Sequence, residues 1–535
     1  MARYPGFVTR LGANAARALR LGVSRFALPR ERFWVRLRLP SPLPEIRTPA
    51  LFGREPTVSL VETLQLLDRA RQDERVAGVM VRVEGPPGGL SVADSLRRSL
   101  LALREAGVPS LVWSERFGTE ELLLASGASR VLLPESGSVF LVGLRLEGFF
   151  VRPLLERLGV RADVVRVGEF KSAAEMFTRE QMSPEHRQQL ESLAEDLSST
   201  VAAGLAEGRD LAAEEMGALV DGGPYGAAAA CEKGLIDGCA YPEDLEKELL
   251  QLAPDVGKPD EVPVVDAAAY LSLRAADAGW RPWLRDLPRF AYVVATGPIH
   301  RGRGFRGVPS DSYRHLFDRL RRDEGVSGVV VRVDSPGGDA VASDLLWQSL
   351  RALGREKPVV ASLGDVAASG GYFLAAAAAA IVAEAASLTG SIGVVGGKLD
   401  LSGLYQRLGV RKDAVERGAR AGLLAEDRPF SQDERRVIRD EMEELYEIFL
   451  ARVATGRGLS RDAVHAAGRG RIWSGRRALE HGLVDQLGGP LEALVELRSR
   501  AGVGRDEPAL MDVHPRIPRI AGLRNALRPW SLELV

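Results

Sequence analysis

The sequence predicts an α/β protein built from two tandem copies of one domain, each with a parallel sheet covered by helices. At 535 residues, the chain is long enough for two substantial cores. Residues 78–89, Gly-Val-Met-Val-Arg-Val-Glu-Gly-Pro-Pro-Gly-Gly, match residues 328–339, Gly-Val-Val-Val-Arg-Val-Asp-Ser-Pro-Gly-Gly-Asp, at an offset of 250 residues. Within each copy, short β-branched runs alternate with helical patterns, which favours parallel strands buried on both faces.

The repeat covers most of the chain. The same offset pairs residues 158–160 with 408–410, both Leu-Gly-Val, and a two-residue shift later pairs residues 234–237 with 482–485. We therefore expect an N-terminal domain over residues 31–285 and a C-terminal domain over residues 286–500. A basic segment, residues 1–30, precedes them, and a tail, residues 501–535, follows.

Composition excludes several classes of protein. The chain is 45% apolar and 27% charged, as soluble globular proteins are, and its net charge of −1 gives no general attraction for nucleic acid. Its two cysteines, Cys231 and Cys239, make no disulfide framework and are expected to be ordinary thiols. No apolar run is long enough to span a bilayer, and the N-terminus lacks the compact pattern of a cleaved signal peptide.

Residues 8–28 are predicted to form an amphipathic helix. Val8, Leu11 and Leu19 fall on one face, whereas Arg10 and Arg17 fall on the other. Such a helix can lie on an anionic membrane surface, or it can pack on the protein or on a partner subunit, and the pattern leaves both open. The alternating apolar residues of 33–39 then predict a strand, and prolines at 40, 42, 44 and 49 predict a linker.

Residues 361–373, Ala-Ser-Leu-Gly-Asp-Val-Ala-Ala-Ser-Gly-Gly-Tyr-Phe, hold the candidate nucleophile. A serine followed by Gly370 and Gly371 can stand at a tight turn with its hydroxyl and the next backbone N–H exposed together, as acyl transfer requires. We interpret Ser369 in this way; the alternative is the small-residue start of an ordinary helix.

A second glycine turn, residues 334–338 (Asp-Ser-Pro-Gly-Gly), follows the strand that ends at Val333. A strand, a glycine turn and a helix N-terminus together present backbone N–H groups to an anion. A plain strand-to-helix turn would have the same pattern, and the two interpretations are compatible.

The two copies differ where the chemistry is expected. Opposite Ser369 the first copy has Thr119 or Glu120, without a glycine pair. Conversely, residues 168–172 of the first copy, Gly-Glu-Phe-Lys-Ser, contain Lys171, whose counterpart in the second copy is Ala421. No histidine is close in sequence to Ser369. A lysine can act as the base if burial lowers its pKa, so we predict one composite Ser-Lys site shared by the halves.

These motifs resemble the signal peptide peptidase A family, in its long tandem-domain bacterial form. The family consists of serine proteases that use a Ser-Lys dyad on a fold related to Clp protease and the crotonases. The resemblance covers roughly residues 30–500 and depends on four motifs in this order: residues 168–172, 334–338, 364–372 (Gly-Asp-Val-Ala-Ala-Ser-Gly-Gly-Tyr) and 389–393 (Thr-Gly-Ser-Ile-Gly).

The resemblance implies roles for individual residues. Ser369 would be the nucleophile, Lys171 the general base, and Ser391 the residue that orients the lysine. The oxyanion hole would be the backbone N–H of Gly370 with one from Gly337 or Gly338. The family also implies no cofactor or metal, apolar peptide substrates such as signal-peptide remnants, and a dome-like homotetramer.

Membrane attachment is where the chain departs from the family, because long members commonly carry an N-terminal membrane-spanning helix. With only the basic segment here, we expect a peripheral protein on the cytoplasmic face of a bacterial inner membrane, or else a soluble cytoplasmic one. Two other functions remain to be weighed. One is a catalytically silent scaffold or peptide-binding protein with a crotonase-like shell, and the other is acyl-CoA chemistry on the related fold.

Overall fold

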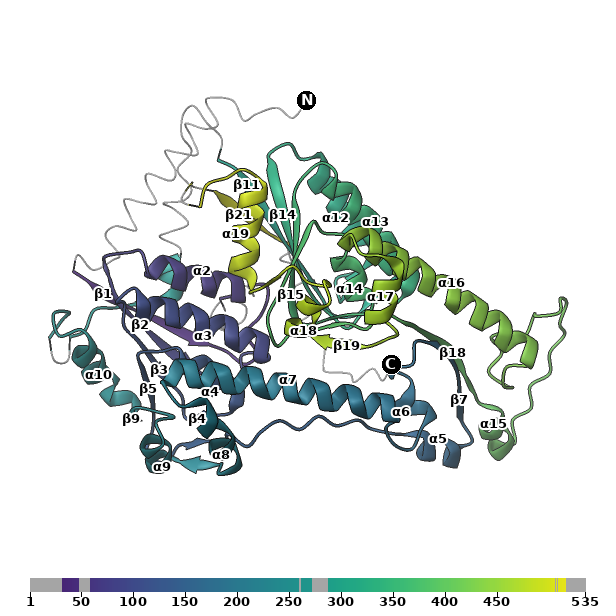
Figure 1. Cartoon of the computed structure of the whole chain (residues 1–535), viewed down its shortest axis with the longest axis horizontal. Helices are drawn as coiled ribbons and strands as arrows, with labels where there is room; N and C mark the ends of the chain where they lie inside the picture. Colours follow the sequence, from purple (N-terminus) through teal and green to yellow (C-terminus); the bar gives the residue numbers. More distant parts are fainter. Residues whose placement is uncertain are drawn as a thin grey trace.

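The computed structural model describes residues 31–47, 58–258, 261–271, 287–505, 507 and 509–515. The helix expected over residues 8–28 lies outside these residues, as does most of the expected tail. The described chain contains two large sheets, one in each half, with helices packed on their faces (Figure 1). This arrangement confirms the predicted α/β class with parallel sheets.

The first sheet is parallel throughout and has six strands. Their order is β10 (Val264–Asp266), β1 (Phe33–Leu39), β2 (Val76–Val83), β3 (Ser110–Trp113), β5 (Arg130–Leu133) and β9 (Gly238–Cys239). Side chains alternate between its faces: Phe33, Val35 and Leu37 enter the core under α2 (Leu60–Ala70) and α3 (Leu90–Glu105), whereas Trp34 enters a smaller core under α10 (Leu245–Leu252). Both faces are therefore covered.

The second sheet carries the order β19 (Ile472–Ser474), β17 (Leu388–Gly390), β15 (Val359–Ala368), β14 (Val326–Ser335), β11 (Arg289–Thr296) and β21 (Leu510–His514). β16 (Ala380–Ala383) and β20 (Gln486–Leu487) extend it from β15. Only the β17–β19 pair is antiparallel. Residues 510–514 were expected in a tail, but Met511 and Val513 pack on the core beneath β11, so this segment is an edge strand.

Helices complete the two halves. The first half adds α4 (Thr119–Ser126), α5 (Arg152–Leu158), α6 (Glu175–Thr178), α7 (Pro184–Arg209), α8 (Met216–Asp221) and α9 (Ala227–Glu232). The second adds α12 (Ser310–Arg322), α13 (Ala340–Gly354), α14 (Gly370–Ala375), α15 (Ser402–Leu408), α16 (Gln432–Arg457), α17 (Arg461–Ala467), α18 (Gly475–Glu480) and α19 (Pro490–Arg500). Among the described helices, none is long and apolar enough to cross a membrane.

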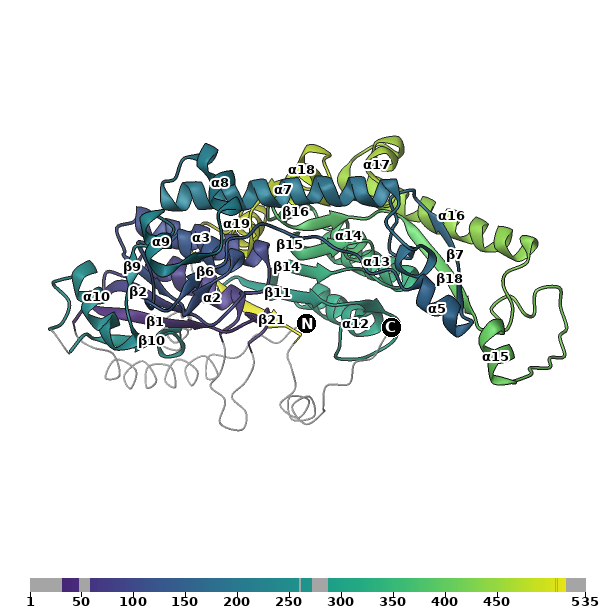
Figure 2. The same ribbon diagram turned by 90° about the horizontal axis from the view of Figure 1, so that it is seen from below.

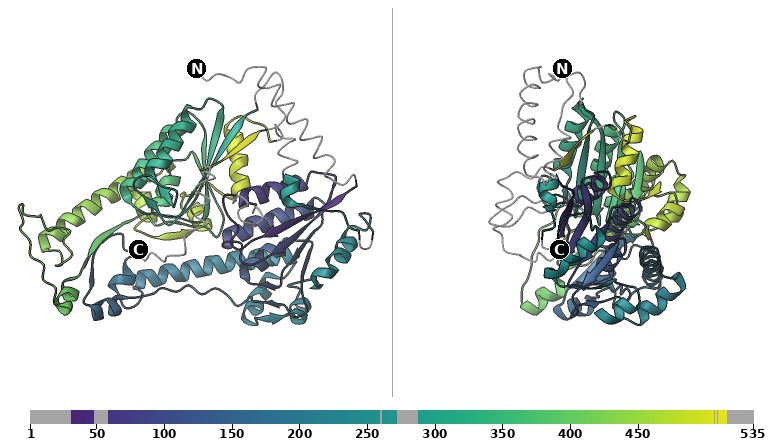
Figure 3. Two further views of the ribbon diagram at one scale, coloured as in Figure 1. Left: turned by 180° about the vertical axis from the view of Figure 1, so that it is seen from behind. Right: turned by 90° about the vertical axis from the view of Figure 1, so that its left-hand side faces the viewer.

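Segments of the first half extend across the second. β7 (Arg161–Val167) pairs antiparallel with β18 (Val394–Asp400), and this ribbon lies at one end of the long axis of the molecule (Figure 3). Helix α7 runs along both halves (Figure 2), where Gln189 accepts the backbone N–H of Ile472 at 2.8 Å. The ribbon places the residues that follow β7 beside those that precede β18.

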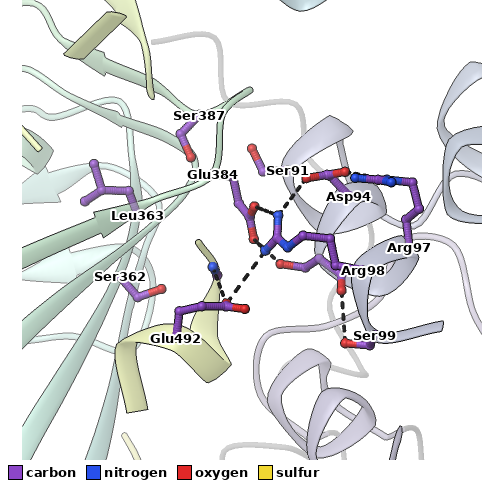
Figure 4. Close-up of polar contacts among 12 residues, drawn as sticks. Ser91, Asp94, Arg97, Arg98, Ser99, Ser362, Leu363, Glu384, Ser387 and Glu492 are labelled. Atoms are coloured by element: carbon purple, nitrogen blue, oxygen red, sulfur yellow. Dashed lines mark hydrogen bonds and ion pairs between the residues drawn. The ribbon is translucent and has the colours of Figure 1, made fainter. Parts of the chain in front are cut away.

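A buried ion pair also joins the halves (Figure 4). Arg98 of α3 donates to both carboxylate oxygens of Glu384, at 2.6 and 2.9 Å, and the Ser95 hydroxyl donates to the same carboxylate. Glu384 is fully buried in the turn between β16 and β17. Burial opposes the charge on Arg98, but Glu384 and Asp94 outweigh it and raise the pKa of Arg98. The pair ties a first-half helix to the turn that leads into β17.

We expect Arg98→Ala to destabilise the protein by about 3–5 kcal/mol, because it leaves the Glu384 carboxylate buried without its cation. A thermal denaturation series on the full chain tests this. The matched control is Arg152→Ala, which removes an exposed pair with Glu156 and should cost less than about 1 kcal/mol. A double change, Arg98→Met with Glu384→Leu, should recover stability relative to Arg98→Ala. Equal melting temperatures for Arg98→Ala and Arg152→Ala would contradict a structural role for the pair.

Candidate active site

Ser369 stands at a strained turn between β15 and α14. Its φ of 53° and ψ of −120° lie in a region that residues other than glycine rarely occupy. The two following glycines are required by close packing, because a Cβ on Gly370 would lie 2.4 Å from the Ser343 hydroxyl oxygen and one on Gly371 would lie 2.5 Å from the Ser335 carbonyl oxygen. The turn therefore holds the Ser369 hydroxyl at the end of the strand.

The structure brings Lys171, Ser369 and Ser391 together from the two halves. Lys171 Nζ lies 3.0 Å from Ser369 Oγ, 3.0 Å from Ser391 Oγ and 2.9 Å from the Ser391 carbonyl oxygen. The lysine belongs to the first half and both serines to the second. The pairing of β7 with β18 produces this meeting, since Lys171 follows β7 by four residues and Ser391 precedes β18 by three.

The environment of Lys171 favours the neutral amine. The side chain is buried, and its polar contacts are two hydroxyls and one carbonyl oxygen, none of them charged. Burial lowers the pKa of Lys171 from 10.5 to about 8. An amine with this pKa is partly unprotonated near neutral pH and can accept a proton from a hydroxyl within hydrogen-bond distance.

Residues 469–471 of the second half bind the backbone on both sides of the site, next to Lys171 and at Ser391. The sequence patterns did not single out residues 469–471. Phe170 donates its backbone N–H to the Arg469 carbonyl oxygen at 2.9 Å, and Ser391 donates its own to the Arg471 carbonyl oxygen at 2.7 Å. Gly470, with a φ of +81°, lies so close that an added Cβ would be 2.5 Å from the Lys171 nitrogen. The positive φ and this close approach require glycine, and the sequence signal was no more than an isolated Arg-Gly-Arg.

The glycine turn after β14 lies directly beside the nucleophile. Ile299 donates to the Gly337 carbonyl oxygen at 2.8 Å, and Asp339 donates to the Ile299 carbonyl oxygen at 3.0 Å. These two bonds form a parallel bridge in which Gly338 lies between the two bonded residues, Gly337 and Asp339. In this pattern the N–H of Gly338 points away from Ile299. The N–H of Gly337 is already used, because it donates to Ser335 Oγ at 3.2 Å. A Cβ on Gly370 would lie 3.3 Å from the Gly338 nitrogen, so the backbone N–H groups of Gly338 and Gly370 are neighbours.

The corresponding positions of the other copy lack this geometry. Helix α4 begins after Gly118, so the position directly before the helix, which Ser369 occupies in the second half, holds a glycine and not the Thr119 or Glu120 expected from the repeat register. Glu120 instead accepts the backbone N–H of Gly89 at 2.9 Å, which fills the glycine turn of the first copy with the protein's own carboxylate. Ala421, opposite Lys171 in the repeat, is exposed.

Histidines and metal ligands play no part in the described site. Within the described residues, no histidine hydrogen-bonds Lys171, Ser369 or Ser391, and no group of three or more His, Cys, Asp or Glu side chains is arranged to hold a metal ion. The chemistry available from these contacts is that of a hydroxyl, an amine and backbone N–H groups.

A hydroxyl at a strained turn, with a buried amine against it, defines a class of serine hydrolases. Comparison with known proteins names the family: the chain belongs to peptidase family S49, whose model matches residues 102–254 and 351–504, once in each half. This confirms the predicted resemblance and the tandem arrangement. The family is one of peptidases, and one relative that matches most of the chain is named a serine protease while two others are named Protease 4, so the comparisons support a serine peptidase.

The relatives cover most of the chain. It is 31% identical to the chloroplastic serine protease SPPA of Arabidopsis thaliana, over 83% of this chain and 66% of that protein, so it spans about two thirds of that relative. It is 27% identical to Protease 4 of Haemophilus influenzae (82% and 72%) and 28% identical to Protease 4 of Salmonella typhi (89% and 78%). Among solved structures, a mutant of ClpP1 from Listeria monocytogenes matches 38% of this chain and 94% of its own, with a TM-score of 0.24 and 13% identity.

We expect the reactivity of the Ser369 hydroxyl to follow the titration of Lys171. Because burial lowers the pKa of this lysine to about 8, the rate of Ser369 labelling by a fluorophosphonate should rise as pH increases through about 8 and fall about tenfold per unit below it. Intact-mass spectrometry across the pH range measures the rate, and thermal denaturation at each pH controls for stability. A labelling rate that is flat between about pH 6 and 9 would show that the amine does not control the hydroxyl.

Proposed function

We propose that the chain is a serine endopeptidase that hydrolyses apolar peptides, including signal-peptide remnants, through a Ser-Lys dyad shared between its halves. The observation that carries the proposal is the 3.0 Å contact between Lys171 Nζ and Ser369 Oγ, made by residues 198 positions apart. One relative that matches 34% of this chain, at 34% identity, is named a putative signal peptide peptidase SppA, which supports the substrate class.

The mechanism begins with proton transfer from Ser369 to the neutral amine of Lys171. The Ser391 carbonyl oxygen can only accept, so it holds one N–H of the amine at 2.9 Å and leaves the lone pair for the Ser369 proton. The Ser369 oxygen then attacks the peptide carbonyl carbon, and the oxyanion accepts hydrogen bonds from the backbone N–H groups of Gly370 and Gly338. Of the two glycines that the sequence left open, we assign this role to Gly338.

Hydrolysis then completes the cycle. The Lys171 ammonium protonates the leaving amine, which breaks the C–N bond and leaves an acyl group on Ser369. The amine, neutral again, takes a proton from water, whose oxygen attacks the ester carbonyl. The resulting Lys171 ammonium then gives that proton to the Ser369 oxygen as the C–O bond breaks and the acid is released. Each step uses the same three side chains and two backbone donors, and none requires a cofactor.

The alternatives explain less of the site. A silent scaffold would have no use for a strained serine against a buried amine, and acyl-CoA chemistry gives no role to a lysine supplied by the other half. For location, we propose peripheral attachment to the cytoplasmic face of the bacterial inner membrane through residues 8–28, with a soluble cytoplasmic protein as the alternative. Fractionation of cells that express the chain with and without residues 1–30 distinguishes them.

Replacement of the site residues should separate their roles. Ser369→Ala should abolish fluorophosphonate labelling and peptide hydrolysis, and Lys171→Ala should lower kcat by about 10²–10⁴ while the fold is retained. Ser391→Ala should lower kcat less than Lys171→Ala and leave KM close to that of the wild type, because it orients the amine without binding the peptide. Lys233→Ala, an exposed lysine of the first half, is the matched control. Full activity of Lys171→Ala on a peptide ester would rule out the shared dyad.

The homotetramer also remains a proposal, and the repeat supports a route to self-assembly. Residues 411–417 are the repeat counterpart of β7 and residues 144–150 that of β18, yet both segments are unpaired and largely exposed. Applied to them, the β7–β18 register places Arg145 opposite Glu416 and Leu146 opposite Val415, which is 97% exposed. Each chain carries one segment of each kind, so the segments can pair head to tail between chains, and the assembly is a ring where the rotation between neighbouring chains closes.

A charge exchange tests this pairing. Arg145→Glu or Glu416→Arg alone should place like charges opposite each other and shift the assembly to smaller species in sedimentation velocity, whereas the two changes together should restore it. Arg152→Glu on the nearby helix α5 serves as the control. Unaltered sedimentation of both single variants would contradict pairing between these strands.

A further inference from the structure

The loop of residues 301–307 lies at the catalytic edge of the second sheet. β15, β14 and β11 are adjacent and parallel, so their carboxyl ends meet at one edge (Figure 2). Ser369 follows β15, the Gly337–Gly338 turn follows β14, and the loop follows β11. In order along this edge come the nucleophile, the turn assigned to the oxyanion, and the loop.

The loop is attached directly to the glycine turn. Ile299, at its start, exchanges backbone hydrogen bonds with Gly337 and Asp339 at 2.8 and 3.0 Å. Arg301 forms an ion pair with Asp339, the N-cap of α13, at 2.9 Å. These contacts fix the first residues of the loop to the backbone on both sides of Gly338.

Polar contacts also hold the loop in one conformation. Both ring nitrogens of His300 lie within hydrogen-bond distance of carbonyl oxygens, that of Arg301 at 3.0 Å and that of Arg306 at 2.9 Å. Gly302 accepts the backbone N–H of Asp311 at 3.0 Å. The exposed side chains of the loop are therefore attached to a backbone that these hydrogen bonds hold in place.

Phe305 is the large side chain at the tip of this loop, and it is 79% exposed. Val341, two residues after Asp339 on the other side of the glycine turn, is 43% exposed. Two exposed apolar side chains therefore flank the turn at which a peptide carbonyl would be held. Exposed aromatic side chains of this kind commonly supply binding contacts.

We propose that the loop of residues 301–307 is a substrate-binding element and that Phe305 binds an apolar side chain of the peptide close to the scissile bond. The inference rests on the proposed peptidase function and adds a specificity-determining residue to it. Phe305 acts on peptide binding, and the proton transfers between Lys171 and Ser369 proceed without it.

The charges of the loop favour a peptide over a membrane surface. Arg301 is paired with Asp339, and Arg303 contacts the ring nitrogen of His315 at 3.2 Å. Of the three loop arginines, only Arg301 has a carboxylate partner among the described residues, because His315 carries no negative charge to offset that of Arg303. Two uncompensated arginines contribute only about 2 kcal/mol at an anionic lipid surface. Binding of an apolar side chain needs no such charge.

The test compares peptides that differ at one position. Leu or Ser is placed at successive positions on both sides of the scissile bond, and the Leu-over-Ser ratio of kcat/KM is measured for the full-length protein. We expect Phe305→Ala to reduce this ratio by about tenfold or more at one position, chiefly through KM, and Phe305→Leu to retain most of it. Tyr241→Ala, which removes an exposed aromatic side chain from the first half, should change the ratio nowhere.

The outcomes are distinguishable. An unchanged ratio at every position in Phe305→Ala would overturn the substrate role while the peptidase function stands. Loss of binding to anionic phospholipid vesicles in Phe305→Ala, with peptide preference intact, would overturn it in favour of a membrane contact. If the wild-type protein cleaves none of the peptides and resists fluorophosphonate labelling, the proposed function fails and this inference fails with it.

Discussion

The candidate site depends on one contact, that between the buried amine of Lys171 and the hydroxyl of Ser369. A lysine loses its charge at modest cost only where water is excluded, and the partners of this one are two hydroxyls and a carbonyl oxygen rather than a carboxylate. Neither half can build that environment alone. The pairing of β7 with β18 and the Phe170–Arg469 backbone bond place a first-half lysine inside the second half.

Divergence of the two copies follows from this constraint. In the proposed dyad, the lysine of one half serves the serine of the other, so neither half needs the residue that the other supplies. The first half has a glycine in place of the nucleophile, and Glu120 fills its glycine turn. The second half leaves Ala421 exposed on the surface where the repeat would place a base. The Arg98–Glu384 pair also joins the two halves, between which the Lys171–Ser369 contact is made.

Particular residues show how far sequence patterns extend. Ser369 and Lys171 were identifiable because each sits in a short glycine-containing motif that the other copy lacks, and Ser391 was identified through the resemblance to a known family. Gly470 and Arg471 were not, because they act through backbone atoms and a close approach, which leave no side-chain chemistry to recognise. The strand at 510–514 was mistaken for a tail because its apolar residues are few and lie among prolines and arginines. Which of Gly337 and Gly338 is proposed as the second oxyanion-hole donor depends on the direction of one N–H group, which the sequence does not show.

The sequence by itself determined the α/β class, the duplication and the candidates Ser369 and Lys171, because periodicity, repeat register and residue type are all local properties of the chain; Ser391 came from the resemblance of its motif to a known family. Only the tertiary structure decided that the lysine and the serine meet, at what distance, and with which neighbours. These depend on pairings between residues far apart in the sequence: β7 with β18 and residue 170 with residue 469, more than 200 positions apart, and residue 391 with residue 471, 80 positions apart. Burial sets the pKa of Lys171, and burial exists only after the two halves have packed together.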